Sequence, residues 1–268
     1  MTNPFLVAST LPYQLPPFAE ITDEHYGPAI EQGMAEQLAE IQNITRRRDM
    51  PTFENTMVPL ESSGQLLTRV LRVFYNKASA DSNDATNALE EELAPKLAAH
   101  DDAIKLDSQL YWRIDQLHER LDELGLNPEQ RYLVERHHTE MTLAGAGLDD
   151  AQKTRLSELN ARLSTLTTRF EKNLLADTNE LAVVIDHATE LDGLSPGEVS
   201  AAAQAAADRD LEGKYLITLV LPTGHPWLES LTNREVRARI MTASRARGSR
   251  DNEHDNRGVL LEIVRLRA

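Results

Sequence analysis

The sequence predicts a mostly α-helical protein: an antiparallel helical bundle with a small two-strand β element in its C-terminal third. Leucine and alanine dominate, while aromatic residues make up only 5% of the chain, a balance that suits packed helices more than sheets. Apolar residues also recur at helical spacing along most of the chain, and short loops separate these segments. At 268 residues and 41% hydrophobic composition, the chain is long enough for one large domain or two smaller ones.

The first elements are marked by prolines and by cap residues. Four prolines lie between residues 4 and 17, which predicts an extended segment that wraps a surface. Thr22 or Asp23 is expected to cap a first helix. That helix should end near RRRDMP (residues 46–51), where cations suit a helix C-terminus and a proline follows.

Two apolar stripes indicate the longest helices. Between residues 53 and 78 apolar positions alternate at steps of four and three, which is a heptad seam, and Pro59 should kink this helix or mark its true start. A second stripe runs through residues 156–174, in a helix that Asp149 or Asp150 caps. Long helices joined by short loops are typical of an antiparallel bundle.

Shorter helices are expected between the two stripes. One spans residues 84–104, with Pro95 as a further kink. The next stops at Gly125, a residue that suits a helix C-terminus. Asn127 then caps another helix, in which Pro128 takes the first position.

After Asn179 the helical apolar stripe gives way to short, β-branched apolar runs. Residues 181–186 and 214–221 predict two strands, separated by a helix that Ser195 caps. Such strands can form a small β layer beside the bundle. The sequence TNRE at residues 232–235 is typical of a capping box that opens another helix.

We therefore expect two regions. Residues 1–180 form the helical bundle, and residues 181–268 form a small α/β element followed by the last helices. The final stretch, residues 255–268, is an amphipathic helix with no glycine or proline stop signal. Whether the polypeptide was cut there is a question that the pattern alone leaves open.

Charge and composition exclude several classes of protein. The formal net charge of −15 argues against general nucleic-acid binding, which needs a basic footprint. Without cysteine there is neither a disulfide nor a thiolate metal site. The first residues do not resemble a signal peptide, and no run of about 18 apolar residues predicts a membrane span. We expect an acidic, soluble, cytoplasmic protein without a membrane partner.

The eight histidines do not form a zinc-peptidase motif. A zinc peptidase needs two histidines four residues apart on a helix, with a glutamate beside the first. His118 and Glu119 begin this pattern, but Asp122 occupies the position of the second histidine. Neither His137 nor His138 has a histidine four residues further on. We expect no catalytic residue and no metal ligand in this chain.

The arginines gather near the C-terminus. Nine of the 22 lie in residues 231–268, interleaved with five acidic residues. Glu235 can pair with Arg239 one helical turn away, and no aromatic side chains accompany the cluster as they do in many nucleic-acid sites. We expect these arginines to pack against the acidic bundle, or against protein outside this chain.

Several stretches together resemble the N-terminal part of the thimet-oligopeptidase family of zinc metallopeptidases, and most of all its bacterial peptidyl-dipeptidases. The likeness runs in order over nearly all of the chain. The stretches in which the likeness is clearest are STLPY (9–13), PPFAEITDEHYGPA (16–29), LESSGQLLTRV (60–70), LAGAGL (143–148), LNARLSTLTTRFEKNLL (159–175) and the C-terminal segment from residue 233.

The resemblance implies a role as the non-catalytic, N-terminal region of a peptidyl-dipeptidase that releases C-terminal dipeptides. The family's catalytic half carries the His-Glu-x-x-His helix and its zinc. No counterpart of that motif exists here, so whether this chain is an enzyme stays uncertain and we expect it to be inactive alone. The implied partners are its own catalytic half and short peptides.

The family's N-terminal helices form the wall and lid of a substrate channel. By resemblance, four polar residues that follow Phe74 are substrate-channel candidates: Tyr75, Asn76, Ser79 and Asn83. Three alternatives remain open, namely an oligopeptidase A-like endopeptidase, a free-standing helical interaction module, and a nucleic-acid binder that uses the arginine-rich tail.

Overall fold

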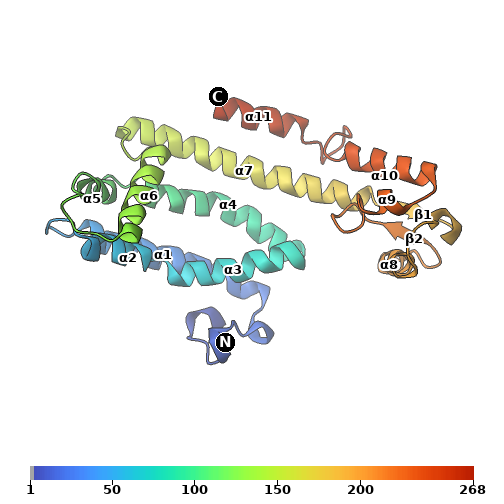
Figure 1. Ribbon diagram of the computed structural model, residues 1–268, viewed down its shortest axis with the longest axis horizontal. Helices are drawn as coiled ribbons and strands as arrows, with labels where there is room; N and C mark the ends of the chain where they lie inside the picture. Colours follow the sequence, from blue (N-terminus) through green and yellow to red (C-terminus); the bar gives the residue numbers. More distant parts are fainter. Residues whose placement is uncertain (1–2) are drawn as a thin grey trace. The chain divides into compact units, whose positions relative to one another are not determined.

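A computed structural model describes residues 3–268, and it confirms the mostly α-helical class with one small antiparallel sheet among these residues (Figure 1). The chain forms two compact units, Met1–Thr165 and Leu166–Ala268. Helix α7 (Asp150–Glu180) runs through the boundary between them. The functional division into residues 1–180 and 181–268 stays a prediction. Across residues 3–268, no helix combines the length and the apolar character that crossing a membrane requires.

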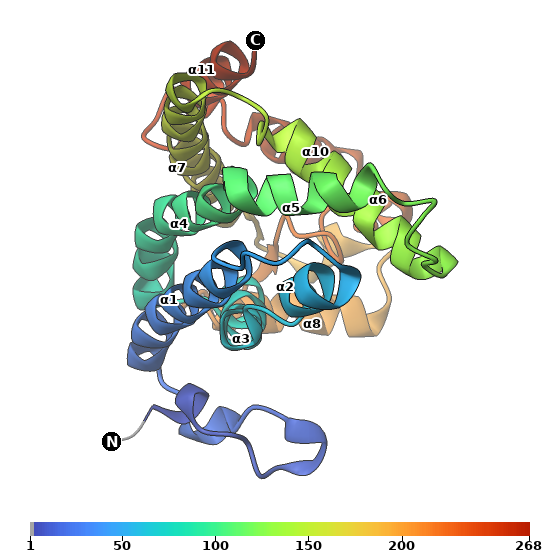
Figure 2. The same ribbon diagram turned by 90° about the vertical axis from the view of Figure 1, so that its left-hand side faces the viewer.

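The first unit is built from short 3-10 turns followed by α-helices (Figure 2). Thr22 and Asn127 take the capping positions that the sequence predicts, and each exchanges hydrogen bonds with the residue three positions on. The elements before α7 are η1 (Pro4–Leu6), η2 (Pro12–Gln14), η3 (Phe18–Glu20), η4 (Asp23–His25), α1 (Tyr26–Thr45), the π-helix η5 (Phe53–Met57), α2 (Val58–Glu61), α3 (Gln65–Ala80), α4 (Asp84–Lys105), α5 (Ser108–His118) and α6 (Pro128–Ala144).

The prediction of one helix from residue 53 to residue 78 is wrong, because Gly64 interrupts it. Pro59 lies in the first turn of α2, which is one of the two places that the sequence allowed for it. Gly64 adopts a left-handed conformation, with φ of 68°, which costs a residue with a side chain free energy. Its N–H donates to Oε2 of Glu40 at 2.8 Å, and helix α3 begins at the next residue. The seam still faces inward on both sides of the break, since Met57, Leu67 and Phe74 are buried.

The helix predicted to stop at Gly125 also ends early. Helix α5 ends at His118, and hydrogen-bonded turns continue the chain to Gly125, whose φ is 61°. Pro95 lies inside α4 without ending it. Before Gly125 the apolar spacing therefore continues through a segment in which the backbone has left the helix.

Helices α1 and α3 pack side by side (Figures 1 and 2). Their contact surrounds an apolar cluster with an aromatic centre, in which Tyr26 lies between Phe5 and Phe74 at ring-centroid distances of 5.4 and 5.3 Å. A second cluster joins the other end of α1 to α5 and α6; its members include Ile41, Ile44, Met57, Leu110, Ile114, Leu117, Val134 and Met141. The unit therefore has an apolar core at each end of α1.

In the second unit a two-strand antiparallel sheet packs with helices, as predicted, but its strands are shorter than expected. Val183 pairs with Ile217, and Ile185 pairs with Tyr215. Ser195 caps α8 as predicted. After α7 the elements are β1 (Val183–Ile185), η6 (Ala188–Leu191), α8 (Pro196–Ala207), β2 (Tyr215–Ile217), α9 (Trp227–Ser230), α10 (Arg234–Ala246) and α11 (Arg257–Arg267).

The capping box predicted at Thr232 is wrong by one residue. The side chain of Asn233 accepts from the N–H groups of Glu235 and Val236 and so caps α10. The Thr232 hydroxyl instead donates to Oδ2 of Asp192 at 2.8 Å. Asparagine is as good a cap as threonine or better. Asn233 can therefore cap the helix while the Thr232 hydroxyl bonds to a distant residue.

A buried carboxylate, Asp177 of α7, holds the loop between α10 and α11. It is 0% exposed and accepts hydrogen bonds from the Gly248 N–H at 2.6 Å and from the Arg250 guanidinium. Arg250 also pairs with Glu180, which lies one turn further along α7. One C-terminal arginine, Arg250, is thus engaged with acids of α7. Packing of the whole arginine-rich segment against the acidic bundle stays a prediction.

Candidate functional site

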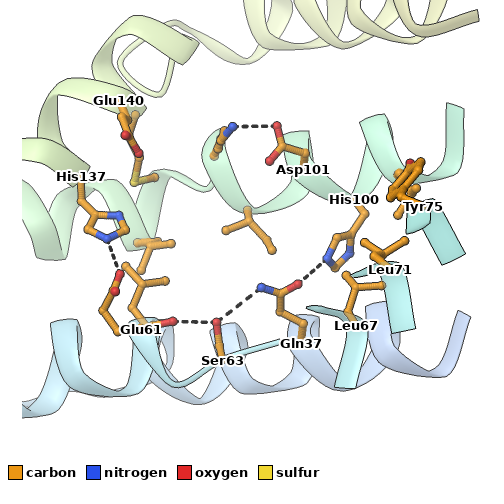
Figure 3. Close-up of a pocket in the computed structure, with 16 residues that line it drawn as sticks. Gln37, Glu61, Ser63, Leu67, Leu71, Tyr75, His100, Asp101, His137 and Glu140 are labelled. Atoms are coloured by element: carbon orange, nitrogen blue, oxygen red, sulfur yellow. Dashed lines mark hydrogen bonds and ion pairs between the residues drawn. The ribbon is translucent and has the colours of Figure 1, made fainter. Parts of the chain in front are cut away.

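A cavity of about 490 Å³ opens among the helices of the first unit (Figure 3). Its size lies in the range of small-molecule and peptide pockets. Each helix from α1 to α6 contributes to it. The lining residues are Gln37, Leu60, Glu61, Ser63, Leu67, Leu71, Tyr75, Leu97, His100, Asp101, Ile104, Lys105, Leu110, His137, Glu140 and Met141.

One side of the cavity is apolar. Leu67, Leu71 and Tyr75 follow one another at four-residue steps along α3, so they lie on the same helical face. Figure 3 shows them together at one end of the cavity. Tyr75 remains 43% exposed, and its ring contacts Phe74 edge to face at 5.4 Å. This side is suited to bury an aliphatic or aromatic group.

The opposite side carries ionisable groups. Nε2 of His137 lies 2.6 Å from Oε1 of Glu61, and Figure 3 shows this pair beside Glu140. The guanidinium of Arg136, which lies outside the lining, donates to Oε1 of Glu140 at 2.7 Å and holds the pKa of that carboxyl below its usual value.

A third carboxylate, Asp101, lies between these two sides (Figure 3). Its Oδ2 is 2.9 Å from Nζ of Lys105, one helical turn along α4. Lys105 is the one lysine or arginine in the lining. The lining therefore holds three carboxylates and a single ammonium group, so it favours cations over anions.

A buried histidine closes the apolar side. Nε2 of His100 lies 2.7 Å from Oε1 of Gln37, whose amide nitrogen donates to the Ser63 hydroxyl at 3.5 Å. Burial lowers the pKa of His100. With Nε2 donating to Gln37, Nδ1 is an acceptor, and it is buried without a hydrogen-bond partner among the described residues.

The four sequence-predicted channel residues do not share one site. Tyr75 lines the 490 Å³ cavity, whereas Asn76 lines an adjoining groove beside the N-terminal segment, which shares Glu61 and Ser63 with the cavity. Ser79 is exposed and donates to the Asn76 carbonyl at 3.1 Å. Asn83 caps α4, and its side-chain nitrogen donates to Oδ2 of Asp23 at 2.8 Å. Their assignment to a substrate channel stays a prediction.

The groove that contains Asn76 measures about 660 Å³. The N-terminal segment forms one side of this groove, where Tyr13 has a left-handed φ of 57° and is 97% exposed. Helix α3 forms the other side, with Arg69 and Arg72. Nη2 of Arg69 is engaged with the Phe5 carbonyl at 2.6 Å, and thereby ties the N-terminal segment to α3.

The histidines singled out for a zinc search have other partners. The rings of His118 and His138 stack at 3.9 Å, and Nε2 of His138 lies 3.0 Å from Oδ1 of Asp115. Within residues 3–268, no three histidine, cysteine, aspartate or glutamate side chains are placed to hold a metal ion together. The described residues therefore do not fit a catalytic zinc ion.

The sequence predicts a role for Tyr75, which lines the cavity, but not for the charged side of the cavity. Glu61 and His137 are 76 residues apart and belong to no shared motif. Their meeting depends on how α2 and α6 pack, which sequence spacing cannot reveal. The arrangement can bind and orient a small group.

Comparison with known proteins gives relatives that match this chain over nearly all of its residues. A dipeptidyl carboxypeptidase of Escherichia coli is 39% identical over 99% of the chain, and its counterpart in Salmonella typhimurium is 38% identical over the same share. Oligopeptidase A of Escherichia coli is 27% identical over 100% of the chain. The chain spans 39% of the length of each of these relatives. No protein-family model matches.

Proposed function

We propose that this chain, which belongs to the thimet-oligopeptidase family, is the N-terminal, non-catalytic region of a zinc-dependent peptidyl-dipeptidase. The observation that carries the proposal is the 39% identity to a dipeptidyl carboxypeptidase over 99% of the chain. The identity to oligopeptidase A is lower, at 27%, which favours release of dipeptides over internal cleavage. The parent enzyme would act on short peptides in the cytoplasm.

In this proposal the chain shapes the path of the substrate, while the catalytic half supplies the chemistry. A zinc ion there would activate a water molecule for attack on the peptide bond. The cavity of the first unit supports a binding role, because it combines an apolar wall with ionisable groups. Tyr75, Asn76, Ser79 and Asn83 remain our candidates for contact with the peptide.

An oligopeptidase A-like endopeptidase is the second candidate, and the 27% identity over the whole chain supports it. Incubation of the intact enzyme with a peptide that carries a blocked N-terminus separates the two. Successive loss of dipeptides from the C-terminus supports the dipeptidase, whereas internal fragments as first products support the endopeptidase.

Reading the coding DNA beyond codon 268 tests the proposal directly. We expect an open reading frame that reaches His-Glu-x-x-His within a few hundred codons. A stop codon directly after Ala268 would contradict the proposal and favour a free-standing interaction module.

The purified chain itself gives a second test. We expect it to bind no stoichiometric zinc by elemental analysis and to release no dipeptide from an unblocked peptide. Zinc-dependent dipeptide release by the chain alone would refute a non-catalytic role. Circular dichroism of the same sample shows whether the chain is folded during the assay.

A further inference from the structure

The 490 Å³ cavity of the first unit has two chemically different sides. Figure 3 shows Glu61, His137 and Glu140 at one end, and Leu67, Leu71 and Tyr75 at the other. A ligand that fits both must carry an apolar group and a polar or charged group a short distance apart. A purely apolar ligand would displace water from Glu61 and Glu140 without offering a hydrogen bond in return, which costs free energy.

The sign of the ligand's charge follows from the lining. Three carboxylates and one ammonium group line the cavity. Asp101 pairs with that ammonium, and Glu140 pairs with Arg136 just outside the lining. Glu61, whose partner is His137, is thus the lining carboxylate without a lysine or arginine partner among the described residues. The surrounding unit adds to this bias, since residues 1–165 contain 27 acidic and 15 basic residues. An anion would meet net repulsion, whereas a cation would be attracted to Glu61 and Glu140.

The hydrogen-bonding capacity of the walls also favours a donor. Carboxylate oxygens only accept hydrogen bonds, so Glu61 and Glu140 at the charged end match a ligand that donates. A protonated amine offers three donors and no acceptor. It therefore matches the carboxylate side better than a hydroxyl or a carboxyl group would.

We propose that this cavity binds the apolar, cationic part of a short peptide, with the amine against Glu61 and Glu140 and an aliphatic group against Leu67, Leu71 and Tyr75. The amine is either the peptide's free α-amino group or the end of a basic side chain next to an apolar residue. This proposal rests on the proposed function, because it makes the cavity a docking point for peptides.

Three small probes test the chemistry and identify the source of the amine. Leucyl-leucinamide carries a free α-amino group, N-acetyl-leucyl-lysinamide carries a side-chain amine, and N-acetyl-leucyl-leucinamide carries neither. Ligand-observed NMR on the 268-residue chain gives a Kd for each. We expect at least one amine probe to bind about tenfold more tightly than the uncharged probe, as expected for a charge-assisted hydrogen bond.

Charge-neutral variants test the location. Glu61→Gln with Glu140→Gln keeps the shape of both side chains, and we expect it to weaken the amine probe about tenfold while leaving the uncharged probe unchanged. Glu129→Gln is the matched control, because Glu129 is an exposed residue of the same helix α6 outside the cavity. It should leave every Kd as it was.

Equal binding of the three probes would overturn the proposal, and so would an amine that binds the double glutamine variant as tightly as the original chain. If neither amine probe binds to a chain that circular dichroism shows to be helical, the proposal is overturned too. None of these results bears on the reading frame or on zinc, so the proposed function would survive them. A stop codon after Ala268 would remove the peptidase context while leaving the cavity's preference for amines measurable.

Discussion

At the scale of single residues, Arg113 is a large, fully buried polar side chain in the first unit. It is 1% exposed, and burial lowers its pKa. Its guanidinium donates to Oδ1 of Asn55 at 2.8 Å, to Oγ1 of Thr56 at 3.2 Å, and to the carbonyls of Arg47 and Asp49 at 3.3 Å each. One side chain of α5 thereby fixes the end of the loop after α1 and the first turn of η5.

Replacing Arg113 should destabilise the first unit. We expect Arg113→Ala to lower the free energy of unfolding by about 3 kcal/mol, because buried acceptors lose their donors and a cavity forms. Arg113→Lys should also lower it, but by less than Arg113→Ala. One ammonium group cannot reach all the acceptors that the planar guanidinium reaches, so part of the loss remains. Urea unfolding followed by Trp112 fluorescence, with Trp227 replaced by phenylalanine, measures both.

Arg155→Ala is the control for this series. Arg155 makes a single salt bridge, to Glu158, and both side chains are more than half exposed. We expect a change within about 0.5 kcal/mol. A loss as large as that of Arg113→Ala would mean that charge, rather than burial, governs the effect.

Local chemistry predicted several caps from the sequence and failed where a tertiary partner intervened. Asn127 and Ser195 cap the helices that follow them, because each is followed three residues later by a side chain that reaches back. Thr232 had the same local pattern, yet Asp192, 40 residues away, accepts its hydroxyl. The pairing of Glu61 with His137 is a similar long-range event, so local sequence patterns carried no signal for it.

At the scale of helices, Gly33 allows α1 and α3 to approach closely. A Cβ built at this position would lie 2.8 Å from the backbone Cα and N of Leu67. That distance is well inside van der Waals contact, and backbone atoms cannot move away as a flexible side chain can. The position therefore selects glycine inside a helix, where alanine is otherwise the better residue.

We expect Gly33→Ala to lower the free energy of unfolding by about 1–3 kcal/mol, because overpacking outweighs the gain in helix propensity. Gly27→Ala in the same helix is the matched control. Its Cβ would meet only Cδ1 of Leu89, at 3.5 Å, so this change should be neutral or slightly stabilising. A stabilised Gly33→Ala variant would show that α1 and α3 can separate at little cost.

The helices themselves were predicted better than their breaks. Apolar periodicity revealed α4 and α7, because each keeps one face inward over several turns, while the cap Asn127 and the following Pro128 revealed the start of α6. It joined η5, α2 and α3 into one helix, since the stripe continues across Gly64 while the backbone does not. Glycine in a stripe is ambiguous: it can be a packing position, as Gly33 is, or a break.

At the scale of the whole molecule, the acidic character sets how stability responds to pH. The chain carries a formal charge of −15, and several carboxylates have pKa values below their usual range. Arg47 lowers the pKa of Asp49 to about 2 through a side-chain hydrogen bond. For Asp177, burial acts to raise the pKa, but the hydrogen bonds from Arg250, Gly248 and Asn252 together outweigh it and lower the pKa.

A carboxylate whose pKa is lower in the folded chain stabilises it fully above the unfolded value and loses this contribution as pH falls. We therefore expect the free energy of unfolding to decrease as pH drops below about 4, near the ordinary aspartate value. Asp177→Asn should be less stable at pH 7, and its stability should fall less steeply in acid. Urea unfolding followed by Trp227, which is 5% exposed, measures both.

Arg234→Ala provides the comparison for Asp177→Asn, since Arg234 is an exposed residue of the same unit. Its acid dependence should follow that of the original chain. An Asp177→Asn variant with an unchanged acid slope would contradict the sign derived for Asp177.

Helix α7 begins in one compact unit and ends in the other, because the boundary at Thr165 and Leu166 falls inside its 31 residues. A dissection at that boundary would leave two frayed helix ends, each without a cap and each with carbonyl or N–H groups newly open to water. A protease that prefers exposed loops would find no cut site there. Genetic shuffling between relatives should therefore exchange α7 as a whole rather than join halves at its midpoint.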